Sequence, residues 1–506
     1  MDRVIDPAEL TPRALADGVL RGKPVAVLGF ARSGIALARF LTDAGADVTV
    51  YDAKPASQLD KAIAAIEDRP VRMLLGPDVD PAVALDGASL VVASPSVNPD
   101  YPTTEPRLRA ALVDLVARRA GGDRSAPALL SEVDLFLRLC PAPTVGITGT
   151  KGKTTTSALT HALLATDDAH PAVLGGNIGI PLVERLPELT PDHRVVVELS
   201  ELQLPTLSRG TTVAAYTNVT ADHLDRHGTI EAYQLVKRRL AKLVDPAGAT
   251  VINLDDPVVA SFSSASAARV VAYQRSEAPQ GGLGVSHGWI VAEMVERLAI
   301  AGGGAAPAGR VLPLAELTIP GAHNASNALA AVAVALLFGI EPAAIRRAAA
   351  AFAGVEHRLE RVAEFGGVRY INDSQGTQPD AVIAALRAFD GPIVLIAGGR
   401  DKGVDLAELA TVVGRRAAAA VLIGESGPRL ERMFRDAGLA TTERADTLDS
   451  AVERATVLAA QAGGARRTTA TVLLSPAAAS FDMFEDYEAR GRAFKAAVRR
   501  LQEAAG

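Results

Sequence analysis

Short apolar runs recur along the whole chain, and each ends near glycine or polar residues and is followed by a longer helix-compatible segment. Such runs are typical of strands that are buried on both faces of a parallel sheet. They lie at residues 25–28, 48–52, 90–93, 145–148, 194–199, 213–218, 250–253, 368–372, 393–397, 419–423 and 471–474. Because strands and helices alternate, the pattern predicts doubly wound α/β domains, in which ligands bind at the carboxyl ends of the strands.

The breaks in this pattern predict an α/β protein of three domains, at residues 1–142, 143–354 and 355–506. The first and the last are expected to be Rossmann-like, and the central one to be built on a parallel sheet of its own. Residues 279–309 are rich in glycine and are expected to form a peripheral subdomain with little chemistry. An Ala-rich helix is predicted to follow residues 321–324.

The composition narrows the class of protein. The chain has 506 residues, of which 48% are apolar, and a net charge of −6 that offers no basic surface for nucleic acid. The single cysteine, Cys140, excludes an intrachain disulfide framework and fits a reducing compartment. The acidic start of the chain is unlike a signal peptide. The most apolar helical stretch, 328–340, is shorter than the roughly 20 residues that a bilayer requires. We therefore expect a cytoplasmic protein without stable membrane insertion.

The most informative motif follows the strand predicted at 145–148 and reads Gly149-Thr150-Lys151-Gly152-Lys153-Thr154-Thr155. A glycine-rich turn that opens a helix presents backbone N–H groups to phosphate oxygens. Lys153 is expected to reach the outer phosphates of a nucleotide, and the Thr154 hydroxyl to bind Mg²⁺. Ile147 stands where the usual phosphate-loop pattern has glycine, so the loop is a variant. The alternative is a tight structural turn.

Polar residues at other predicted strand ends are further candidates. Glu198 is placed to hold Mg²⁺ or its water shell, or else is a surface acid. His223 is expected to bind metal, to orient a substrate or to cap a helix. Arg358 has the planar fork that clamps phosphate, although an isolated arginine is more often part of a surface ion pair. Residues 233–239 are predicted to be helical, with a basic, solvated face.

The first domain carries an incomplete dinucleotide fingerprint. A glycine turn at residues 29–34 follows the first strand, and Asp52 ends the second strand. Ala31 stands where a second glycine would let the backbone approach a pyrophosphate. A dehydrogenase would need that glycine, and it has no use for a phosphate loop.

The order of these motifs resembles that of the Mur ligases, the ATP-dependent amide-forming enzymes of peptidoglycan precursor synthesis. The resemblance covers almost the whole chain. Its most specific motifs are residues 149–154, 175–179, 198–200, 218–226, 321–324, 357–358, 372–374 and 474–476. Folylpolyglutamate synthase shares the central and last domain types but lacks a uridine-binding first domain, and the segment from Val25 to Ala93 argues against it.

The resemblance implies a role for each domain. The first domain would bind the uridine nucleotide of the substrate through Ser33, Asp52 and Lys54, and Asn177 and Ser200 would contact the muramoyl part. The central domain would bind ATP. The implied ATP ligands are Gly149, Thr150, Lys151, Gly152, Lys153, Thr154 and Thr155, with Asn324 near adenine, Arg358 at the phosphates and Asp373 at the ribose.

The resemblance also implies two Mg²⁺ ions. Thr154 and Glu198 would hold metal, and His223 and Lys237 would hold the second ion once CO₂ has converted Lys237 to a carbamate. A lysine ammonium would repel Mg²⁺, whereas a carbamate is an anionic oxygen ligand. The alternative for Lys237 is an ion pair with a substrate or phosphate. The implied catalytic residues are Lys153, Glu198, His223, Lys237 and Arg358.

The implied reaction adds D-glutamate to UDP-N-acetylmuramoyl-L-alanine through an acyl phosphate, in a protein expected to be a monomer. Thr377, Lys402, Ser480 and Tyr487 match positions that bind the amino acid. Three positions depart from the family pattern: Gln375 replaces a substrate-contacting lysine, Tyr487 a phenylalanine, and Glu201 a small hydroxyl residue. The departures leave open L-glutamate or another amino acid as substrate, and the other alternative is a non-catalytic nucleotide sensor.

Overall fold

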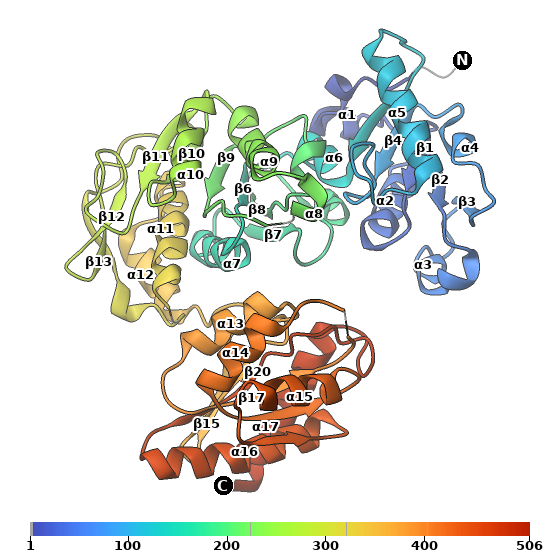
Figure 1. Ribbon diagram of the computed structural model, residues 1–506. Coiled ribbons are helices and arrows are strands. Elements are labelled where there is room, and N and C mark those ends of the chain that lie inside the picture. Colours follow the sequence, from blue (N-terminus) through green and yellow to red (C-terminus); the bar gives the residue numbers. More distant parts are fainter. Residues whose placement is uncertain (1–3, 223, 320, 402, 506) are drawn as a thin grey trace. The chain divides into compact units, whose positions relative to one another are not determined.

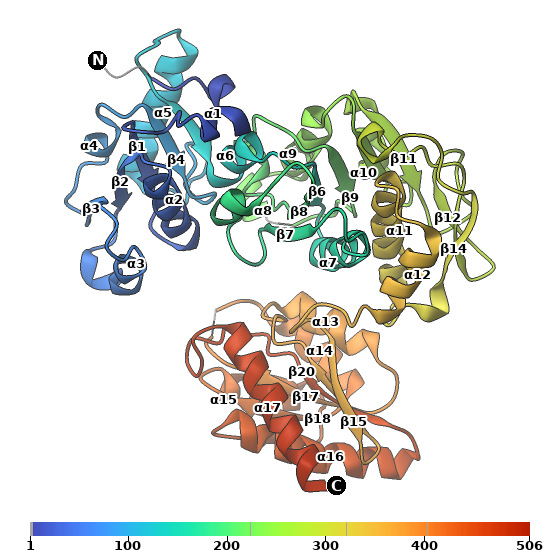
Figure 2. The same cartoon turned by 180° about the vertical axis from the view of Figure 1, so that it is seen from behind.

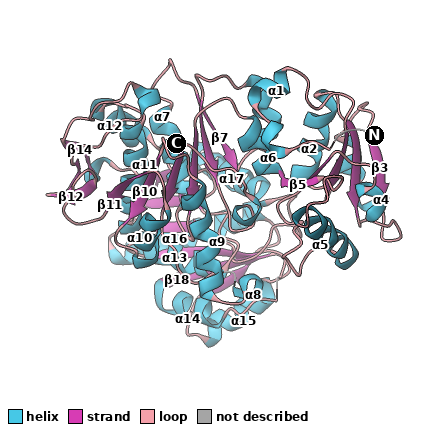
Figure 3. Ribbon diagram, turned by 90° about the horizontal axis from the view of Figure 1, so that it is seen from above, coloured by secondary structure: helices cyan, strands magenta, loops and turns pink. Residues whose placement is uncertain are grey.

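The structure is a computed structural model that describes residues 4–222, 224–319, 321–401 and 403–505 (Figure 1). The chain divides into two compact units, Met1–Leu317 with Ala322–Phe352, and Thr318–Gly321 with Ala353–Gly506. Three sheets with flanking helices confirm the predicted α/β class (Figure 3). Among the described residues, no helix is long and apolar enough to cross a membrane.

The first unit begins with a five-stranded parallel sheet in the order β3-β2-β1-β4-β5. Its strands are β1 (Pro24–Leu28), β2 (Asp47–Asp52), β3 (Arg72–Leu75), β4 (Leu90–Ala93) and β5 (Ala128–Ser131). Its helices are α1 (Pro12–Ala16), α2 (Arg32–Asp43), α3 (Asp60–Ala64), α4 (Ala82–Leu85), α5 (Pro106–Ala120) and α6 (Glu132–Leu139). Successive residues of β1 point to opposite faces of the sheet. Val25 and Val27 pack in the core that contains α2, whereas Ala26 and Leu28 pack in the core that contains α5.

The second sheet of this unit has nine strands in the order β14-β13-β12-β11-β10-β9-β6-β8-β7. They are β6 (Thr144–Thr148), β7 (Ala172–Gly176), β8 (Arg194–Glu198), β9 (Val213–Tyr216), β10 (Ala249–Asn253), β11 (Arg269–Tyr273), β12 (Leu283–Ser286), β13 (Trp289–Ala292) and β14 (Gly309–Pro313). The helices are α7 (Lys153–Leu164), α8 (Leu224–His227), α9 (Ile230–Leu243), α10 (Pro257–Ser261), α11 (Ala322–Leu337) and α12 (Pro342–Ala351). Figure 2 shows α7, α11 and α12 side by side, and the apolar residues of α7 and α11 share one buried core.

The glycine-rich stretch 279–309 does not form a separate subdomain. Its strands β12 and β13 continue the central sheet, which turns antiparallel from β12 onward. His287 and Gly288 connect them with φ of 50° and 77°, the backbone that a two-residue hairpin turn requires. The stretch therefore lengthens the sheet away from the phosphate loop.

The second unit holds a six-stranded sheet in the order β15-β16-β20-β17-β18-β19, parallel except for the β15–β16 pair. Its strands are β15 (Glu360–Phe365), β16 (Val368–Asn372), β17 (Ile393–Gly398), β18 (Ala417–Ile423), β19 (Thr442–Arg444) and β20 (Ala470–Leu474). Its helices are α13 (Pro379–Ala388), α14 (Ala407–Arg416), α15 (Gly427–Asp436), α16 (Leu448–Arg466) and α17 (Tyr487–Ala505). α13, α14 and α15 contribute to one buried core of this unit, and α16 and α17 to the other.

Short 3-10 helices connect these elements: η1 (Pro7–Glu9), η2 (Ala56–Gln58), η3 (Leu182–Glu188), η4 (Leu204–Thr206), η5 (Phe262–Ala265), η6 (Ala299–Ala301) and η7 (Leu314–Glu316). Within the first unit, η3 packs against α2 and α6, and its Val183 lies in the same buried core as Leu37 and Phe136. The five-stranded and nine-stranded sheets are thus joined by a continuous apolar core.

Candidate nucleotide and substrate sites

The loop between β6 and α7 has the geometry of a phosphate-binding loop. Gly152 ends it with φ of 85°, and α7 begins at Lys153 without a side-chain cap. The backbone N–H groups of the first turn of α7 are therefore directed to an outside acceptor, at the positive end of the helix dipole. A Cβ atom on Gly152 would lie 2.3 Å from Oδ1 of Asn327. Glycine is the residue that this position accommodates.

The loop is held in place by the segment that follows β9. The Thr150 N–H donates to the Asn218 carbonyl at 2.7 Å, and the Lys151 N–H donates to Asn218 Oδ1 at 3.0 Å. Thr217 Oγ1 donates to the Lys151 carbonyl at 2.7 Å. These bonds fix the loop before any ligand binds, which lowers the entropy lost on binding.

Lys153, Thr154 and Thr155 form the first turn of α7. Lys153 Nζ donates to the Gly149 carbonyl at 3.1 Å and to the Thr150 carbonyl at 2.8 Å, so its ammonium group lies over the loop. Thr154 and Thr155 are each only 9% exposed. The three side chains are thus gathered where a nucleotide's phosphates would bind.

Glu198 lies at the same edge of the sheet. It ends β8 and is paired in register with Ile147 of β6, directly before the phosphate loop. The Asn177 Nδ2–H donates to Glu198 Oε1 at 2.9 Å, whereas Oε2 is buried without a hydrogen-bond partner among the described residues. A buried carboxylate oxygen without a partner is costly unless a cation or donor satisfies it.

Lys237 is fully buried beside the phosphate loop, which contradicts the prediction of a basic, solvated face for residues 233–239. Its Nζ donates to the Gly149 carbonyl at 3.0 Å and to Thr148 Oγ1 at 3.4 Å. It also lies 5.3 Å from the centre of the Tyr233 ring. Burial, followed by the nearby charge of Lys153, lowers the pKa of Lys237 to about 7.

The residues at this edge fit Mg²⁺ together with nucleotide phosphates. Mg²⁺ is usually held by one or two carboxylates together with phosphate oxygens and waters. The Glu198 oxygen without a hydrogen-bond partner and the Thr154 hydroxyl offer oxygen ligands for such an ion. No group of three His, Cys, Asp or Glu side chains with the arrangement of a metal site occurs among the described residues. His223, a predicted ligand, lies outside those residues.

Asn324 is buried at the start of α11, behind the phosphate loop. Its Oδ1 accepts a hydrogen bond from Asn327 Nδ2 at 2.8 Å. Because Asn327 also borders Gly152, the amide pair connects the predicted adenine contact to the loop.

The predicted uridine contacts come together at the carboxyl edge of the first sheet. Asp52 Oδ2 accepts from the Phe30 N–H at 2.7 Å, and Oδ1 accepts from the Lys54 N–H at 2.9 Å. Ser33 lies in the first turn of α2, which follows the glycine turn that contains Gly29 and Phe30.

Ser200, a predicted muramoyl contact, follows β8. It donates through its N–H and its hydroxyl to Gln203 Oε1 at 2.9 and 3.0 Å.

The second unit gathers other predicted residues at the carboxyl edge of its sheet. Asp373 is 4% exposed, and its Oδ2 accepts from Ser475 Oγ at 2.6 Å. Burial raises the pKa of Asp373 to about 6, opposed by the Ser475 hydrogen bond and by the charge of Arg358. Ser480 follows β20 and is buried, and Thr377 follows β16. Lys402 lies outside the described residues.

Arg490 was not singled out from the sequence, yet it organises the loops of this edge. It is 1% exposed, its Nε donates to Ser374 Oγ at 3.0 Å, and its Nη2 donates to the Ser374 carbonyl at 2.9 Å. A third bond runs from Nη1 to the Ala478 carbonyl at 3.2 Å. The Ser374 hydroxyl in turn donates to the Tyr487 carbonyl at 2.7 Å. No sequence signal identifies this arginine, because its partners are the hydroxyl and carbonyl of Ser374, 116 residues away, and the Ala478 carbonyl.

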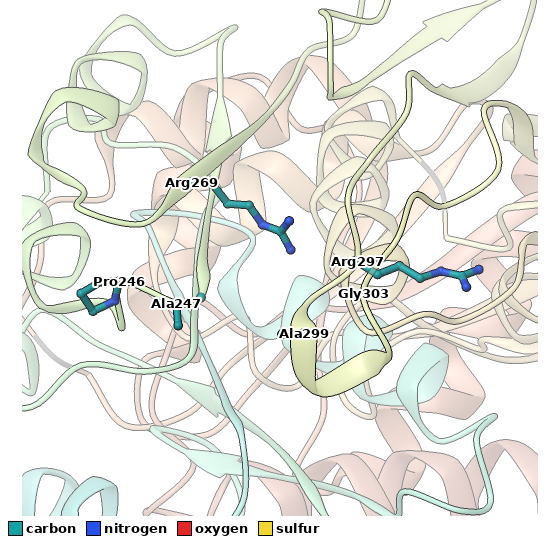
Figure 4. Close-up of a pocket in the computed structure, with 7 residues that line it drawn as sticks. Pro246, Ala247, Arg269, Arg297, Ala299 and Gly303 are labelled. Atoms are coloured by element: carbon teal, nitrogen blue, oxygen red, sulfur yellow. The ribbon is translucent and has the colours of Figure 1, made fainter.

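A pocket of about 280 Å³ lies elsewhere in the first unit (Figure 4). It is lined by Pro246, Ala247, Gly248, Arg269, Arg297, Ala299 and Gly303. The Arg297 side chain points away from Arg269 in Figure 4 and pairs with Glu341 at 2.6 Å. None of the predicted site residues lines this pocket.

The chain matches two family descriptions, the Mur ligase middle domain over residues 147–335 and the Mur ligase glutamate ligase domain over residues 357–478. It is 39% identical over 482 residues to a Pelotomaculum thermopropionicum protein named UDP-N-acetylmuramoylalanine–D-glutamate ligase, covering 95% of this chain and 98% of the relative. A protein of the same name from Anaeromyxobacter dehalogenans is 40% identical over 493 residues, covering 94% of this chain and 97% of the relative.

Two solved structures share the fold. The Thermotoga maritima UDP-N-acetylmuramate-alanine ligase MurC has a TM-score of 0.55 at 18% identity, with 95% of this chain and 99% of that chain covered. Acinetobacter baumannii MurF has a TM-score of 0.56 at 16% identity, with 96% and 98% covered. These likenesses concern the fold alone.

Proposed function

The chain belongs to the Mur ligase family, and on that premise we propose that it joins D-glutamate to UDP-N-acetylmuramoyl-L-alanine and converts ATP to ADP and phosphate. One observation carries the proposal: the phosphate loop, Glu198 and the buried Lys237 meet at one sheet edge, in a chain 31–40% identical over nearly its full length to proteins named for this reaction. The protein would act in the cytoplasm as a monomer.

The proposal assigns one task to each domain. Residues 1–142 bind the uridine nucleotide through Ser33, Asp52 and Lys54. Residues 143–354 bind ATP, and residues 355–506 bind the amino acid. Support for the first assignment comes from Asp52, which ties its own strand end to the glycine turn that precedes Ser33.

ATP binding uses groups that the loop already presents. The N–H groups of the first turn of α7, which begins without a side-chain cap, bind phosphate oxygens. The Lys153 ammonium leaves the loop carbonyls to pair with the outer phosphates. Arg358 supplies a second cation for the phosphates, Asp373 accepts from the ribose, and Asn324 contacts adenine. Thr154 and Glu198 would hold Mg²⁺, which would supply positive charge to neutralise the transferring phosphoryl group.

Lys237 is proposed to react with CO₂ and to become a carbamate. Its amine must be neutral to attack CO₂, and the buried site between the Tyr233 ring and the phosphate loop disfavours the ammonium form. With His223 it would then offer oxygen and nitrogen ligands to a second Mg²⁺ ion.

The reaction has two steps. An oxygen of the alanyl carboxylate attacks the γ-phosphorus of ATP, the bond to the β-phosphate oxygen breaks, and ADP leaves. The neutral amine of D-glutamate then attacks the acyl carbon, phosphate departs with the former carboxylate oxygen, and the amine proton passes to solvent. Positioning and charge neutralisation supply most of the acceleration in such phosphoryl transfers.

The test combines product analysis with isotope labelling. Purified protein with UDP-N-acetylmuramoyl-L-alanine, D-glutamate, ATP and Mg²⁺ is expected to release ADP and phosphate in equal amounts and to form a product heavier by one glutamyl residue. When the alanyl carboxylate carries ¹⁸O, one label is expected in the released phosphate. Unlabelled phosphate would refute the acyl phosphate route. ATP binding without turnover would favour a nucleotide sensor.

A further inference from the structure

Four loops at the carboxyl edge of the third sheet are tied to one another. They follow the adjacent strands β16, β20, β17 and β18. The Ala477 N–H donates to the Gly376 carbonyl at 2.9 Å, which joins the first two loops, and the Arg400 N–H donates to the Ala479 carbonyl at 2.8 Å. The Ser426 N–H donates to the Gly399 carbonyl at 2.8 Å. The main chain of Arg400 is therefore fixed beside the residue that precedes Ser480.

Glutamate brings two carboxylates to this edge, yet Gln375 on the loop after β16 is uncharged. Its Oε1 atom is buried without a hydrogen-bond partner among the described residues. The two carboxylate charges of glutamate require cations or several hydrogen-bond donors in a partly desolvated site. The family resemblance assigns one cation to Lys402, which lies outside the described residues. A second cation is therefore sought among the described residues of this edge.

The other arginines near this edge are already engaged. Arg490 uses its buried guanidinium to hold main-chain carbonyls and Ser374. Arg429 donates to both oxygens of Asp401 at 2.8 and 2.9 Å. Arg358 is assigned to the nucleotide phosphates. These three side chains are thus committed to other partners.

Arg400 differs from them. Its side chain is 61% exposed, and among the described residues its ion partner is Glu425, which is 57% exposed and 3.8 Å away. An exposed pair at this distance contributes little to stability, because water screens it and two long side chains must be ordered. A substrate carboxylate is therefore able to replace Glu425 as the partner of Arg400.

We propose that Arg400 binds one carboxylate of the incoming amino acid and thereby selects a dicarboxylic substrate. The proposal rests on the proposed D-glutamate ligation. The planar guanidinium matches a carboxylate with two parallel hydrogen bonds, which neutral Gln375 cannot provide. Glu425 acts as an internal competitor that holds the guanidinium until the amino acid arrives.

Steady-state kinetics of the full-length enzyme test this assignment. Arg400→Gln is expected to raise the KM for D-glutamate about tenfold or more, because a charge-assisted bidentate contact is lost. The kcat and the KM values for ATP and the UDP substrate should change little. Arg432→Gln, which removes an exposed arginine from α15 of the same unit, is the matched control and should leave all constants unchanged.

Two further variants separate recognition from a structural effect. Glu425→Gln is expected to lower the KM for D-glutamate about two- to threefold, since the competitor is weakened. Gln375→Lys added to Arg400→Gln should restore most of the lost affinity. The preference for D-glutamate over D-glutamine should shrink in Arg400→Gln and return in the double variant.

These outcomes distinguish failure of the proposed ligase function from failure of the Arg400 assignment. If the wild-type protein turns over no D-glutamate, the proposed function fails. If the wild-type protein does turn over D-glutamate, two results would overturn the assignment of Arg400 and leave the ligase function standing. One is a KM for D-glutamate in Arg400→Gln within twofold of wild type, and the other is a loss of kcat with that KM unchanged. A rise in the KM for D-glutamate that Gln375→Lys reverses supports the assignment.

Discussion

If Lys237 binds a metal ion as a carbamate, as we propose, removal of CO₂ is expected to inactivate the protein. CO₂ removal would act on a single amine that is fully buried between the Gly149 carbonyl, the Thr148 hydroxyl and the Tyr233 ring. Restoring bicarbonate should restore activity without refolding.

The lowered pKa of Lys237 gives the magnitude. At pH 7.5 an amine with a pKa of about 7 is roughly three-quarters neutral, whereas one with the ordinary value of 10.5 is about one part in a thousand neutral. Burial, with the charge of Lys153, therefore raises the reactive fraction roughly 750-fold. Below pH 7 the ammonium form returns, so the carbamate and the activity should both decline as the solution is acidified.

The assay pairs activity with direct detection of the carbamate. Protein equilibrated with ¹³C-bicarbonate should show one carbamate signal by NMR, which Lys237→Met removes together with at least about 99% of the activity, the scale of loss when a charge-stabilising group is deleted. Lys242→Met, an exposed lysine on the same helix, is the control and should change neither readout. Full activity in CO₂-free buffer, with no carbamate signal, would refute the reasoning.

Three other substitutions have expected outcomes. Gly152→Ala should abolish most ATP binding by calorimetry, because its φ of 85° costs about 1–2 kcal/mol for a residue with Cβ and that atom would lie 2.3 Å from Asn327 Oδ1. Glu201→Gln should lower the free energy of unfolding by about 1–3 kcal/mol in urea titrations, because the mostly buried Arg226 loses its charged partner at 2.8 Å. The pKa of Asp373 is raised to about 6, so below that pH the wild-type carboxyl becomes protonated and loses the proposed acceptor for the ribose. The KM for ATP of the wild-type protein should therefore rise on acidification, and Asp373→Asn should remove this pH dependence.

The Glu201→Gln prediction has a matched control, and each of the three predictions has an outcome that would contradict it. Glu188→Gln breaks an exposed pair with Arg185 and should change the unfolding free energy by less than about 0.5 kcal/mol. The single tryptophan, Trp289, reports unfolding of the first unit by fluorescence. Equal losses in Glu188→Gln and Glu201→Gln would contradict the buried-pair argument, and wild-type ATP affinity in Gly152→Ala would contradict the steric one. If the KM for ATP of Asp373→Asn still rose at acidic pH as in the wild type, another group would be responsible for that rise.

The sequence predicts the phosphate loop and the strand ends well, for a physical reason. Buried parallel strands are almost continuously apolar, so their ends are visible where polar residues such as Glu198 and Asp52 begin. The carboxyl ends of parallel strands share one edge, and the predicted residues accordingly gather there.

The surroundings of Lys237 could not be predicted in this way. Three consecutive basic residues on a helix suggest a solvated face, and the burial of one of them depends on tertiary packing. The spacing of four residues between Tyr233 and Lys237 is the one local clue, because such residues lie on the same side of a helix. The contacts of Arg490 also could not be predicted from the sequence, since they depend on tertiary packing that brings the loops of Ser374 and Ala478 to its guanidinium.

D-glutamate ligation is tested by measuring ADP release with UDP-N-acetylmuramoyl-L-alanine, Mg²⁺ and bicarbonate across a panel of amino acids. D-glutamate, L-glutamate, D-aspartate, L-lysine and meso-diaminopimelate are compared at equal concentrations. We expect turnover with D-glutamate well above all others, with neutral Gln375 compensated by Arg400. Preferred turnover of L-glutamate or of a cationic amino acid would contradict it.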